Sequence, residues 1–246
     1  MIPVNQSDIN HKVQLQRLLV SLVDDNFIPQ NSYFKGGTCA EMSGFLDRFS
    51  VDLDFDLKKG ADIKIFRSRL EKIAKKLNLV DNNKNTKSLF FTYKYKSLLN
   101  QRNTLKLSFF GNEAHSSEVV ASNDYETRFL PEIDRAVNCQ TLETMFSNKL
   151  VAPLDRFERK MQVVGRDIYD IYYFFSQGYK FKPEIIEERT NLNEVEYIKK
   201  LIKFIENKVT DKILTEDLNL LLPLEKFNKI RKTLKQDVLM FLRNST

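Results

Sequence analysis

The spacing of hydrophobic residues changes along the chain, and the change divides it into two parts. Up to about residue 135, some segments alternate with the two-residue period of strands and others follow the 3.6-residue period of helices. From about residue 140 onward the pattern is helical throughout. We therefore expect an α+β fold, with a small mixed β-sheet domain over residues 1–135 and an α-helical domain over residues 136–246. No Gly/Ser-rich linker separates them, so we expect the two domains to pack closely.

The first part is predicted to contain helices and strands in mixed order. In sequence these are a helix over 7–25, an extended segment over 27–35, a short helix from about residue 38, a strand over 50–57, a helix over 63–77, and strands over 87–97 and 103–110. Ser7 and Asp62 stand where two of the helices would begin and can cap them. Residues 111–136 have no clear period, and we expect them to be irregular with short strands.

The second part is predicted to be a series of helices. Their expected ranges are 141–156, 166–177, 183–190, 194–207, 215–221 and 224–243.

Three aspartates alternate along the predicted strand SVDLDFDL. Side chains two positions apart in a strand point to the same face, so Asp52, Asp54 and Asp56 share one face. Like charges this close repel each other unless cations compensate them. Alternating carboxylates suit Mg²⁺, which takes oxygen ligands and keeps positions open for water and phosphate. A solvent-facing strand of acids is the structural alternative.

A Gly-Gly-Thr sequence lies shortly before these acids, at residues 36–38. Glycines allow a phosphate to approach the backbone, and the N–H groups that open a following helix bind anions. By itself the triplet is equally typical of a strand-to-helix turn. Together with the downstream aspartates, it indicates an enzyme that holds a nucleoside triphosphate while metal ions act on the α-phosphate.

The net charge of +6 is unevenly distributed. Residues 82–112 contain no acid, but they contain six basic residues and several aromatic ones. Basic side chains attract phosphates and aromatic rings stack on bases, so Lys87, Lys94 and Lys96 are candidates for RNA binding. A two-stranded hairpin with a solvated lysine face and core aromatics is the alternative, and the residue types alone favour it.

Composition excludes several classes of protein. No apolar run is long enough to span a membrane, and residues 1–13 lack the basic-then-apolar pattern of a signal peptide, so we expect a cytoplasmic protein without membrane partners. The two cysteines stand far apart and the two histidines have no close partner. We therefore expect neither a disulfide framework nor a zinc site.

Two motif blocks resemble the nucleotidyltransferases of the AbiEii/AbiGii toxin family, within the DNA polymerase β-like superfamily. The first block is GGT…G…R-x-S-x-D-x-D, formed by Gly36, Gly37, Thr38, Gly44, Arg48, Ser50, Asp52 and Asp54. The second comprises LETMFSNKLVAPLDR and GRDIYDIYYFF, which carry Lys149, Arg156, Arg166, Asp167, Tyr169 and Asp170. The resemblance covers roughly residues 34–178. It implies a nucleotidyltransferase domain followed by a helical domain that closes the active-site cleft.

The resemblance also assigns roles to individual residues. Asp52 and Asp54 are implied to be catalytic and to hold two Mg²⁺ ions. The nucleotide is implied to contact Gly36, Gly37, Thr38, Arg48, Ser50 and Lys106.

Lys149, Asp167 and Asp170 are the implied catalytic residues of the second block. Asp167 and Asp170 are three positions apart and share a helical face, so without the resemblance an ion-pair network on a helix surface would explain them. With it, we favour Asp167 over Asp170 because it directly follows Arg166.

One position departs from the family pattern. A third carboxylate commonly follows a lysine by two positions on a neighbouring strand, but LKLSFF places Ser108 two residues after Lys106. Serine is neither a base nor a strong metal ligand. Either Asp56, Asp167 or Asp170 takes this role, or the position is dispensable, or catalysis is impaired.

These residues predict the transfer of a nucleoside monophosphate from an NTP to an acceptor hydroxyl. The resemblance implies a bacterial toxin–antitoxin or phage-defence role, an antitoxin as a partner, and the 3′ end of tRNA as an acceptor for some members. The alternatives are nucleotidylation of a protein and a weakened nucleotide-binding module that regulates without catalysis.

Overall fold

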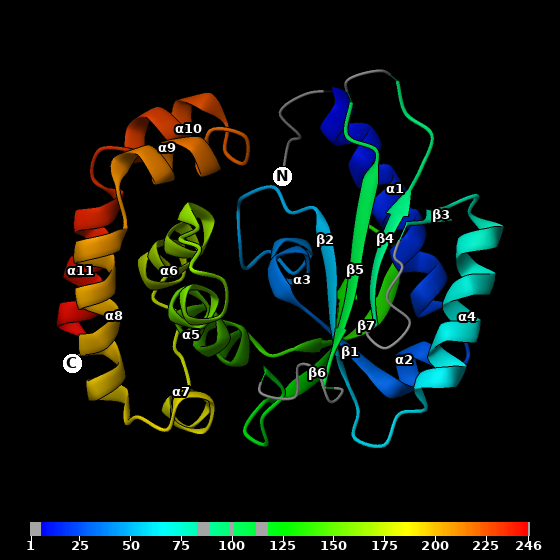
Figure 1. The fold of residues 1–246 in the computed structure, drawn as a ribbon, viewed down its shortest axis with the longest axis horizontal. Helices are drawn as coiled ribbons and strands as arrows, with labels where there is room; N and C mark the ends of the chain where they lie inside the picture. Colours follow the sequence, from blue (N-terminus) through cyan, green and yellow to red (C-terminus); the bar gives the residue numbers. More distant parts are fainter. Residues whose placement is uncertain (1–5, 83–88, 99–100, 112–117, 246) are drawn as a thin grey trace. The chain divides into compact units, whose positions relative to one another are not determined.

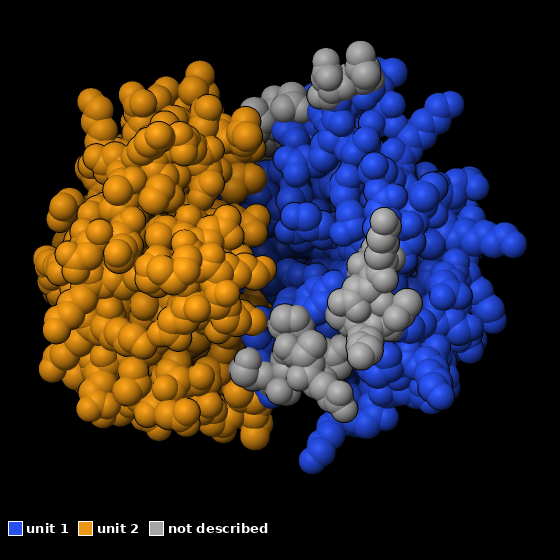
Figure 2. All heavy atoms as spheres, in the orientation of Figure 1, with its two compact units in different colours: residues 1–119, 124–140 blue, residues 120–123, 141–246 orange. Residues whose placement is uncertain are grey.

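The computed structural model describes residues 6–82, 89–98, 101–111 and 118–245. The chain forms two compact units, which Figure 2 distinguishes by colour. The first unit comprises Met1–Val119 and Asp124–Gln140, and the second comprises Val120–Asn123 and Thr141–Thr246. No helix in the described ranges is long and apolar enough to cross a membrane.

The first unit is built on a mixed sheet of seven strands (Figure 1). The strands are β1 (Ser32–Lys35), β2 (Asp52–Leu57), β3 (Val80–Asp81), β4 (Phe90–Lys94), β5 (Thr104–Phe110), β6 (Tyr125–Leu130) and β7 (Arg135–Gln140), in the order β3-β4-β5-β2-β1-β7-β6. β2 lies near the middle of the sheet, antiparallel to β1 and parallel to β5. The acidic strand is therefore flanked on both sides by strands that can supply cations or ligands.

Four helices accompany the sheet: α1 (Gln6–Val23), α2 (Ile28–Asn31), α3 (Gly36–Met42) and α4 (Ile63–Lys76). α1 and α4 lie on one side of the sheet and α3 on the other (Figure 1). Stacked and tilted rings join Phe34 to Phe55, Phe55 to Phe109 and Phe109 to Phe66 of α4, with centroids 5.0–5.2 Å apart. This aromatic core buries the apolar side of β2 and leaves the aspartates on the opposite side.

The second unit is helical, as the pattern predicts. Its helices are α5 (Leu142–Lys160), α6 (Gly165–Ser176), α7 (Pro183–Thr190), α8 (Glu194–Lys208), α9 (Asp211–Leu218), α10 (Leu224–Ile230) and α11 (Leu234–Asn244). Side chains of Thr141, Asn193 and Thr210 cap α5, α8 and α9 by accepting backbone N–H bonds. The α+β class, with a mixed sheet followed by helices, is confirmed.

Some predicted elements differ from the observed ones. The helix expected over 224–243 is two helices, α10 and α11. Residues 27–35 contain the short helix α2 before β1, because Pro29 favours a first turn and Asp25 accepts the N–H groups of Phe27 and Ile28. Ser7 does not cap α1 but lies within it, and its hydroxyl accepts the backbone N–H of Arg102.

Residues 111–136, expected to be irregular with short strands, contain β6 and the start of β7, whose ladder runs from Tyr125–Gln140 to Leu130–Arg135. One helix boundary differs from the expected one. The helix expected over 215–221 begins earlier, because Thr210 caps α9 and Asp211 starts it.

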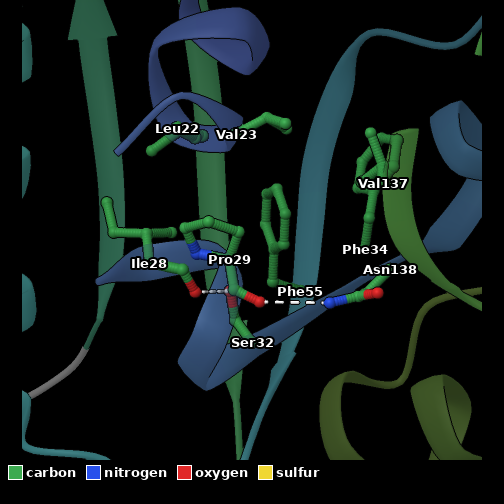
Figure 3. A pocket seen from close by; sticks show the side chains of 9 residues that line it. All are labelled: Leu22, Val23, Ile28, Pro29, Ser32, Phe34, Phe55, Val137 and Asn138. Atoms are coloured by element: carbon green, nitrogen blue, oxygen red, sulfur yellow. Dashed lines mark hydrogen bonds between the residues drawn. The ribbon is translucent and has the colours of Figure 1, made fainter. Parts of the chain in front are cut away.

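A small cavity in the first unit belongs to the core. Figure 3 shows it beside α1, α2, β1 and β7, lined largely by apolar side chains such as Leu22, Phe55 and Val137. Its volume is about 10 Å³, which is room for about one water molecule. It does not include the acidic face of β2 and is not a substrate site.

Candidate active site

The three alternating aspartates of β2 are not equivalent. Asp52 and Asp54 are half-buried on the open face of the sheet, and they alternate with Leu53 and Phe55, which are buried on the other face. Asp56 lies on the same side but is completely buried. Only the first two carboxylates are therefore placed to meet a metal ion or a substrate.

Three donors, one of them a cation, contact the buried carboxylate of Asp56. The Lys35 ammonium lies 2.7 Å from its Oδ1, and its Oδ2 accepts the Tyr125 hydroxyl at 3.0 Å and the Gln140 side-chain amide at 2.5 Å. A buried carboxylate is tolerated when it is paired and hydrogen-bonded in this way. Asp56 thus ties β1, β6 and β7 to β2, and its burial argues against the role of the third carboxylate that is absent at Ser108.

Lys35 belongs to the same face of the sheet. It lies directly across from Asp54 in the β1–β2 ladder, and its ammonium also approaches Glu118 Oε2 at 3.3 Å. Burial lowers the pKa of Lys35, but the carboxylates of Asp56 and Glu118 outweigh this effect and raise it above the ordinary value. Lys35 therefore stays charged at neutral pH and offsets part of the repulsion among the acids.

The glycine loop packs directly against the acids. Gly36 adopts φ +80°, and a Cβ there would lie 2.7 Å from Asp54 Oδ2. A Cβ at Gly37 would lie 2.7 Å from Ser50 Oγ and 3.0 Å from Arg48 Nη2. Both positions therefore require glycine, the first for its backbone conformation and its contact and the second for its contact.

The loop opens α3 without a side-chain cap. Lys35 is the N-cap residue, and its side chain bonds no backbone N–H of the first turn. The Thr38 hydroxyl donates instead to the backbone carbonyl of Asp52, so it fixes the start of β2. Backbone N–H groups of an uncapped first turn suit an anion such as a phosphate, although α3 is short.

Arg48 and Ser50 are buried beneath this loop. Arg48 donates to the Ser50 hydroxyl at 3.0 Å, and the Ser50 backbone N–H donates to Glu41 Oε2 at 3.0 Å. Burial raises the pKa of Glu41, and its ion pair with Lys12 at 2.9 Å opposes that effect. These contacts fix the segment that leads into β2, so they hold Asp52 and Asp54 in place.

The neighbouring strand β5 adds two polar side chains to the open face. The parallel register pairs Lys106 with Asp52 and Ser108 with Asp54. Ser108 therefore occupies the strand position beside Asp54, and the expected shared face of Lys106 and Ser108 is observed. No described group of three or more acidic, histidine or cysteine side chains forms a metal cluster.

Of the three lysines considered for RNA binding, Lys94 lies on the open face of the sheet. The β4–β5 ladder pairs Lys94 with Thr104, so Lys94 lies on the same face as Lys106 and is exposed. Lys96 follows β4 and is exposed as well. Lys87 lies outside the described residues.

Lys149, Asp167 and Asp170 all lie in the second unit. Lys149 of α5 pairs with Asp170 of α6 at 2.7 Å, and Arg156 pairs with Asp167 at 2.8 Å. Asp167 and Asp170 are buried, with exposed fractions of 3% and 0%. The residues thus form two ion pairs between α5 and α6, in which the carboxylates are buried and the cations are half-buried. Asp170, not Asp167, is the carboxylate in contact with Lys149.

Asp52 and Asp54 fit a magnesium ion. Mg²⁺ is commonly held by one or two carboxylates together with substrate phosphates, and it keeps several waters. Two half-exposed carboxylates match this donor set, and Gly36 leaves no side chain between Asp54 and the loop.

Several residues that build the site were not identified from the sequence. They are Lys12, Lys35, Glu41, Glu118, Tyr125 and Gln140. For Lys35, the sequence signal that could have identified it is its position immediately before Gly36, at the end of a strand.

Comparison with known proteins gives both a family and a fold. A family model described as "Nucleotidyl transferase AbiEii toxin, Type IV TA system" matches residues 17–234. Curated protein sequences gave no significant match.

Three solved structures resemble the chain over nearly its whole length. A protein from H. pylori proposed to be a nucleotidyltransferase has a TM-score of 0.59 and 20% identity, covering 97% of this chain and 94% of that one. JHP933 from Helicobacter pylori has a TM-score of 0.50 and 18% identity, with 98% and 96% covered. MenT4, a nucleotidyltransferase toxin from Mycobacterium tuberculosis H37Rv, has a TM-score of 0.50 and 14% identity, with 96% and 84% covered. At these identities the similarities show the fold.

Proposed function

Because the chain belongs to the AbiEii nucleotidyl transferase toxin family, we propose that it moves the nucleoside monophosphate of an NTP to a hydroxyl group of RNA and releases pyrophosphate. The family match confirms the resemblance of the two motif blocks. The acceptor, the metal and the residue roles below are part of the proposal.

One observation carries the proposal: two half-exposed carboxylates, a glycine loop and an uncapped helix start meet on one face of the sheet. The Asp54 carboxylate occupies the space that a side chain at position 36 would take, and the hydroxyl of Thr38 donates to the backbone carbonyl of Asp52. A triphosphate bound at the loop would lie next to both carboxylates. This is the arrangement that phosphoryl-transfer chemistry needs, since such catalysis consists mostly of positioning and charge stabilisation.

Asp52 and Asp54 would hold Mg²⁺, and the ion would stabilise charge on the attacking and leaving oxygens. Gly36 and Gly37 allow the phosphates to approach the backbone, and Thr38 contributes its backbone N–H, because its hydroxyl is engaged with Asp52. Lys106, which lies across from Asp52, would neutralise phosphate charge.

Lys149 is proposed to bind the triphosphate as a cation fixed in place by its partner. An ammonium held 2.7 Å from the fully buried Asp170 has restricted rotamers, so less side-chain entropy is lost when it binds a phosphate. Arg48 and Ser50 support the loop from below, and Asp167 fixes Arg156.

An RNA acceptor is favoured by the charge of the open face. Lys94 and Lys106 lie on the same side of the sheet as Asp52, and Lys96 is exposed two residues beyond the end of β4. An RNA backbone crossing this face would replace counterions at these lysines. The family description places the protein in a type IV toxin–antitoxin system, so we also propose an antitoxin partner.

The test is incubation of the purified protein with each α-labelled NTP, Mg²⁺, and either total RNA or total protein. The proposal predicts labelled RNA, and no label with Asp52→Asn or Asp54→Asn variants that remain folded. Label on protein instead of RNA would show that the acceptor is a protein. Nucleotide binding without any transfer would favour a regulatory module. Ser108 beside Asp54, where the family commonly has a carboxylate, is the observation behind this alternative.

A further inference from the structure

A second cavity of the first unit lies between the first half of α1 and the segment that follows β4. Its volume is about 300 Å³, at the lower end of the range of small-ligand sites. The lining residues that determine its chemistry are Asn10, Val13, Gln14, Lys96, Leu98 and Gln101. None of the described residues that line it is acidic. The cavity therefore suits a ligand that is neutral or anionic.

Several polar groups of this cavity have hydrogen-bonding capacity that the described residues leave unused. The side-chain oxygens of Asn10 and Gln14 each accept from a neighbour on α1, whereas their NH2 groups donate to no described residue. Lys96 is exposed and adds a positive charge. The side-chain oxygen of Gln101 is buried and accepts from no described residue. A ligand that carries hydrogen-bond acceptors and a negative charge would use these groups.

The cavity lies at the same end of the sheet as Asp52. The end of β4 lies beside the start of β5, and β5 runs parallel to β2, whose first residue is Asp52. Tyr95 lines the cavity, and its hydroxyl lies 3.0 Å from Nδ1 of His11. Nε2 of the same ring lies 3.1 Å from the carbonyl oxygen of Val51, the residue before Asp52. One buried imidazole therefore connects the cavity wall to the backbone that leads into the candidate acids.

An unpaired nucleotide matches this combination of groups. Its base has an apolar ring face, which Val13 and Leu98 can contact because their side chains are 46% and 72% exposed. The edge of the base carries acceptors for the amides of Asn10 and Gln14, and its phosphate is an anion for Lys96. Single-stranded RNA presents such groups, whereas a duplex keeps the base edges paired.

We propose that this cavity binds one unpaired nucleotide of the RNA acceptor, close to the hydroxyl that receives the nucleoside monophosphate. This inference rests on the proposed function, because it assumes that the acceptor is RNA. Lys94 and Lys106 on the open face attract any RNA backbone, so they do not distinguish one RNA from another. The cavity adds a preference for single-stranded RNA over duplex RNA.

The experiment compares Gln14→Ala with Gln16→Ala and wild type. Both variants lose a glutamine of α1, but Gln16 does not line the cavity, and its amide donates to Glu132 at 3.1 Å. Fluorescence anisotropy measures the binding of a short labelled single-stranded RNA, the same RNA as a duplex, and a fluorescent ATP analogue. Each titration is run at several salt concentrations without divalent ions, so that no transfer occurs. Urea unfolding checks that each variant is folded.

Gln14→Ala should bind the single-stranded RNA about fivefold more weakly than wild type, as expected for one lost hydrogen bond, and Gln16→Ala should match wild type. The salt dependence should be the same in all three proteins, because neither variant loses a phosphate contact. Affinities for the duplex and for the ATP analogue should also be equal. This combination separates recognition of a base from general attraction to phosphates.

The other outcomes separate this inference from the proposed function. Equal affinities of the three proteins for single-stranded RNA would refute the base site and leave the RNA acceptor in place. Weaker binding of only the ATP analogue by Gln14→Ala would place the NTP in the cavity and overturn the inference. If wild type binds a poly-glutamate peptide more tightly than RNA and Gln14→Ala does not, the cavity is a site for an acidic peptide. If wild type binds no RNA, the RNA acceptor and the inference both fail, whereas nucleotidyl transfer to protein would still be measurable.

Discussion

Replacement of Gly36 by alanine tests whether the glycine loop positions Asp54. The new Cβ would lie 2.7 Å from Asp54 Oδ2, whereas ordinary contacts begin at 3.4 Å. The carboxylate or the loop must therefore move by about 0.7 Å. A shift approaching 1 Å at a reacting centre reduces rates by up to about 100-fold.

Gly44 provides a matched control for this substitution. It adopts φ +76°, close to the +80° of Gly36, but a Cβ there would meet nothing within 4 Å. Alanine in the left-handed region costs about 1–2 kcal/mol at either position. Both variants should therefore lose this backbone contribution to the free energy of unfolding, and Gly36→Ala should lose more because of its contact with Asp54.

The assay is nucleotidyl transfer from a labelled NTP, with urea unfolding of each variant in the same buffer. We expect Gly44→Ala to keep transfer within about twofold of wild type. Gly36→Ala should lose roughly 10–100-fold in rate, because the displaced carboxylate no longer meets the metal in the same geometry. Equal rates in the two folded variants would show that the close approach of Gly36 to Asp54 has no part in the reaction.

Three further predictions concern other parts of the molecule. Burial lowers the pKa of His11, so the stability contributed by its neutral form is complete above pH 6.5 and is lost as the pH falls below that value. Below pH 6.5 the free energy of unfolding should therefore fall more steeply in wild type than in His11→Gln, by up to about 1.4 kcal/mol per pH unit. Parallel curves for the two proteins would contradict this. Lys94→Gln/Lys96→Gln should weaken RNA binding and flatten its salt dependence with NTP affinity nearly unchanged, whereas identical salt titrations would remove these lysines from the interface. Arg156→Met, which takes the arginine from the buried Asp167, should lower the free energy of unfolding by about 2 kcal/mol or more in urea titrations, and an unchanged midpoint would disprove this.

Much of the fold could be predicted because local patterns decide it. Strict alternation placed β2, and Asp62 caps α4 by accepting two backbone N–H groups, as expected. The break between α10 and α11 was missed because buried positions such as Phe227, Ile230 and Leu234 keep a helical spacing across it. Periodicity alone cannot show an interruption that preserves the period.

The candidate site was only partly predictable, because burial and partners depend on tertiary contacts. The pattern placed Asp52, Asp54 and Asp56 on one face, but it could not show that Lys35 and two residues from β6 and β7 take Asp56 out of solvent. Spacing likewise put Asp167 and Asp170 on one helix face, whereas the choice of partner depends on how α5 packs on α6.

We expect this protein to transfer a nucleoside monophosphate with Asp54 at the reacting centre. The most direct measurement compares one NTP labelled at the α-phosphate with the same NTP labelled at the γ-phosphate, using wild type and Asp54→Asn. Wild type should transfer only the α-label to its acceptor and release the γ-label as pyrophosphate, and the folded variant should do neither. Transfer of the γ-label, or unchanged α-label transfer by Asp54→Asn, would show that this reaction is wrongly assigned.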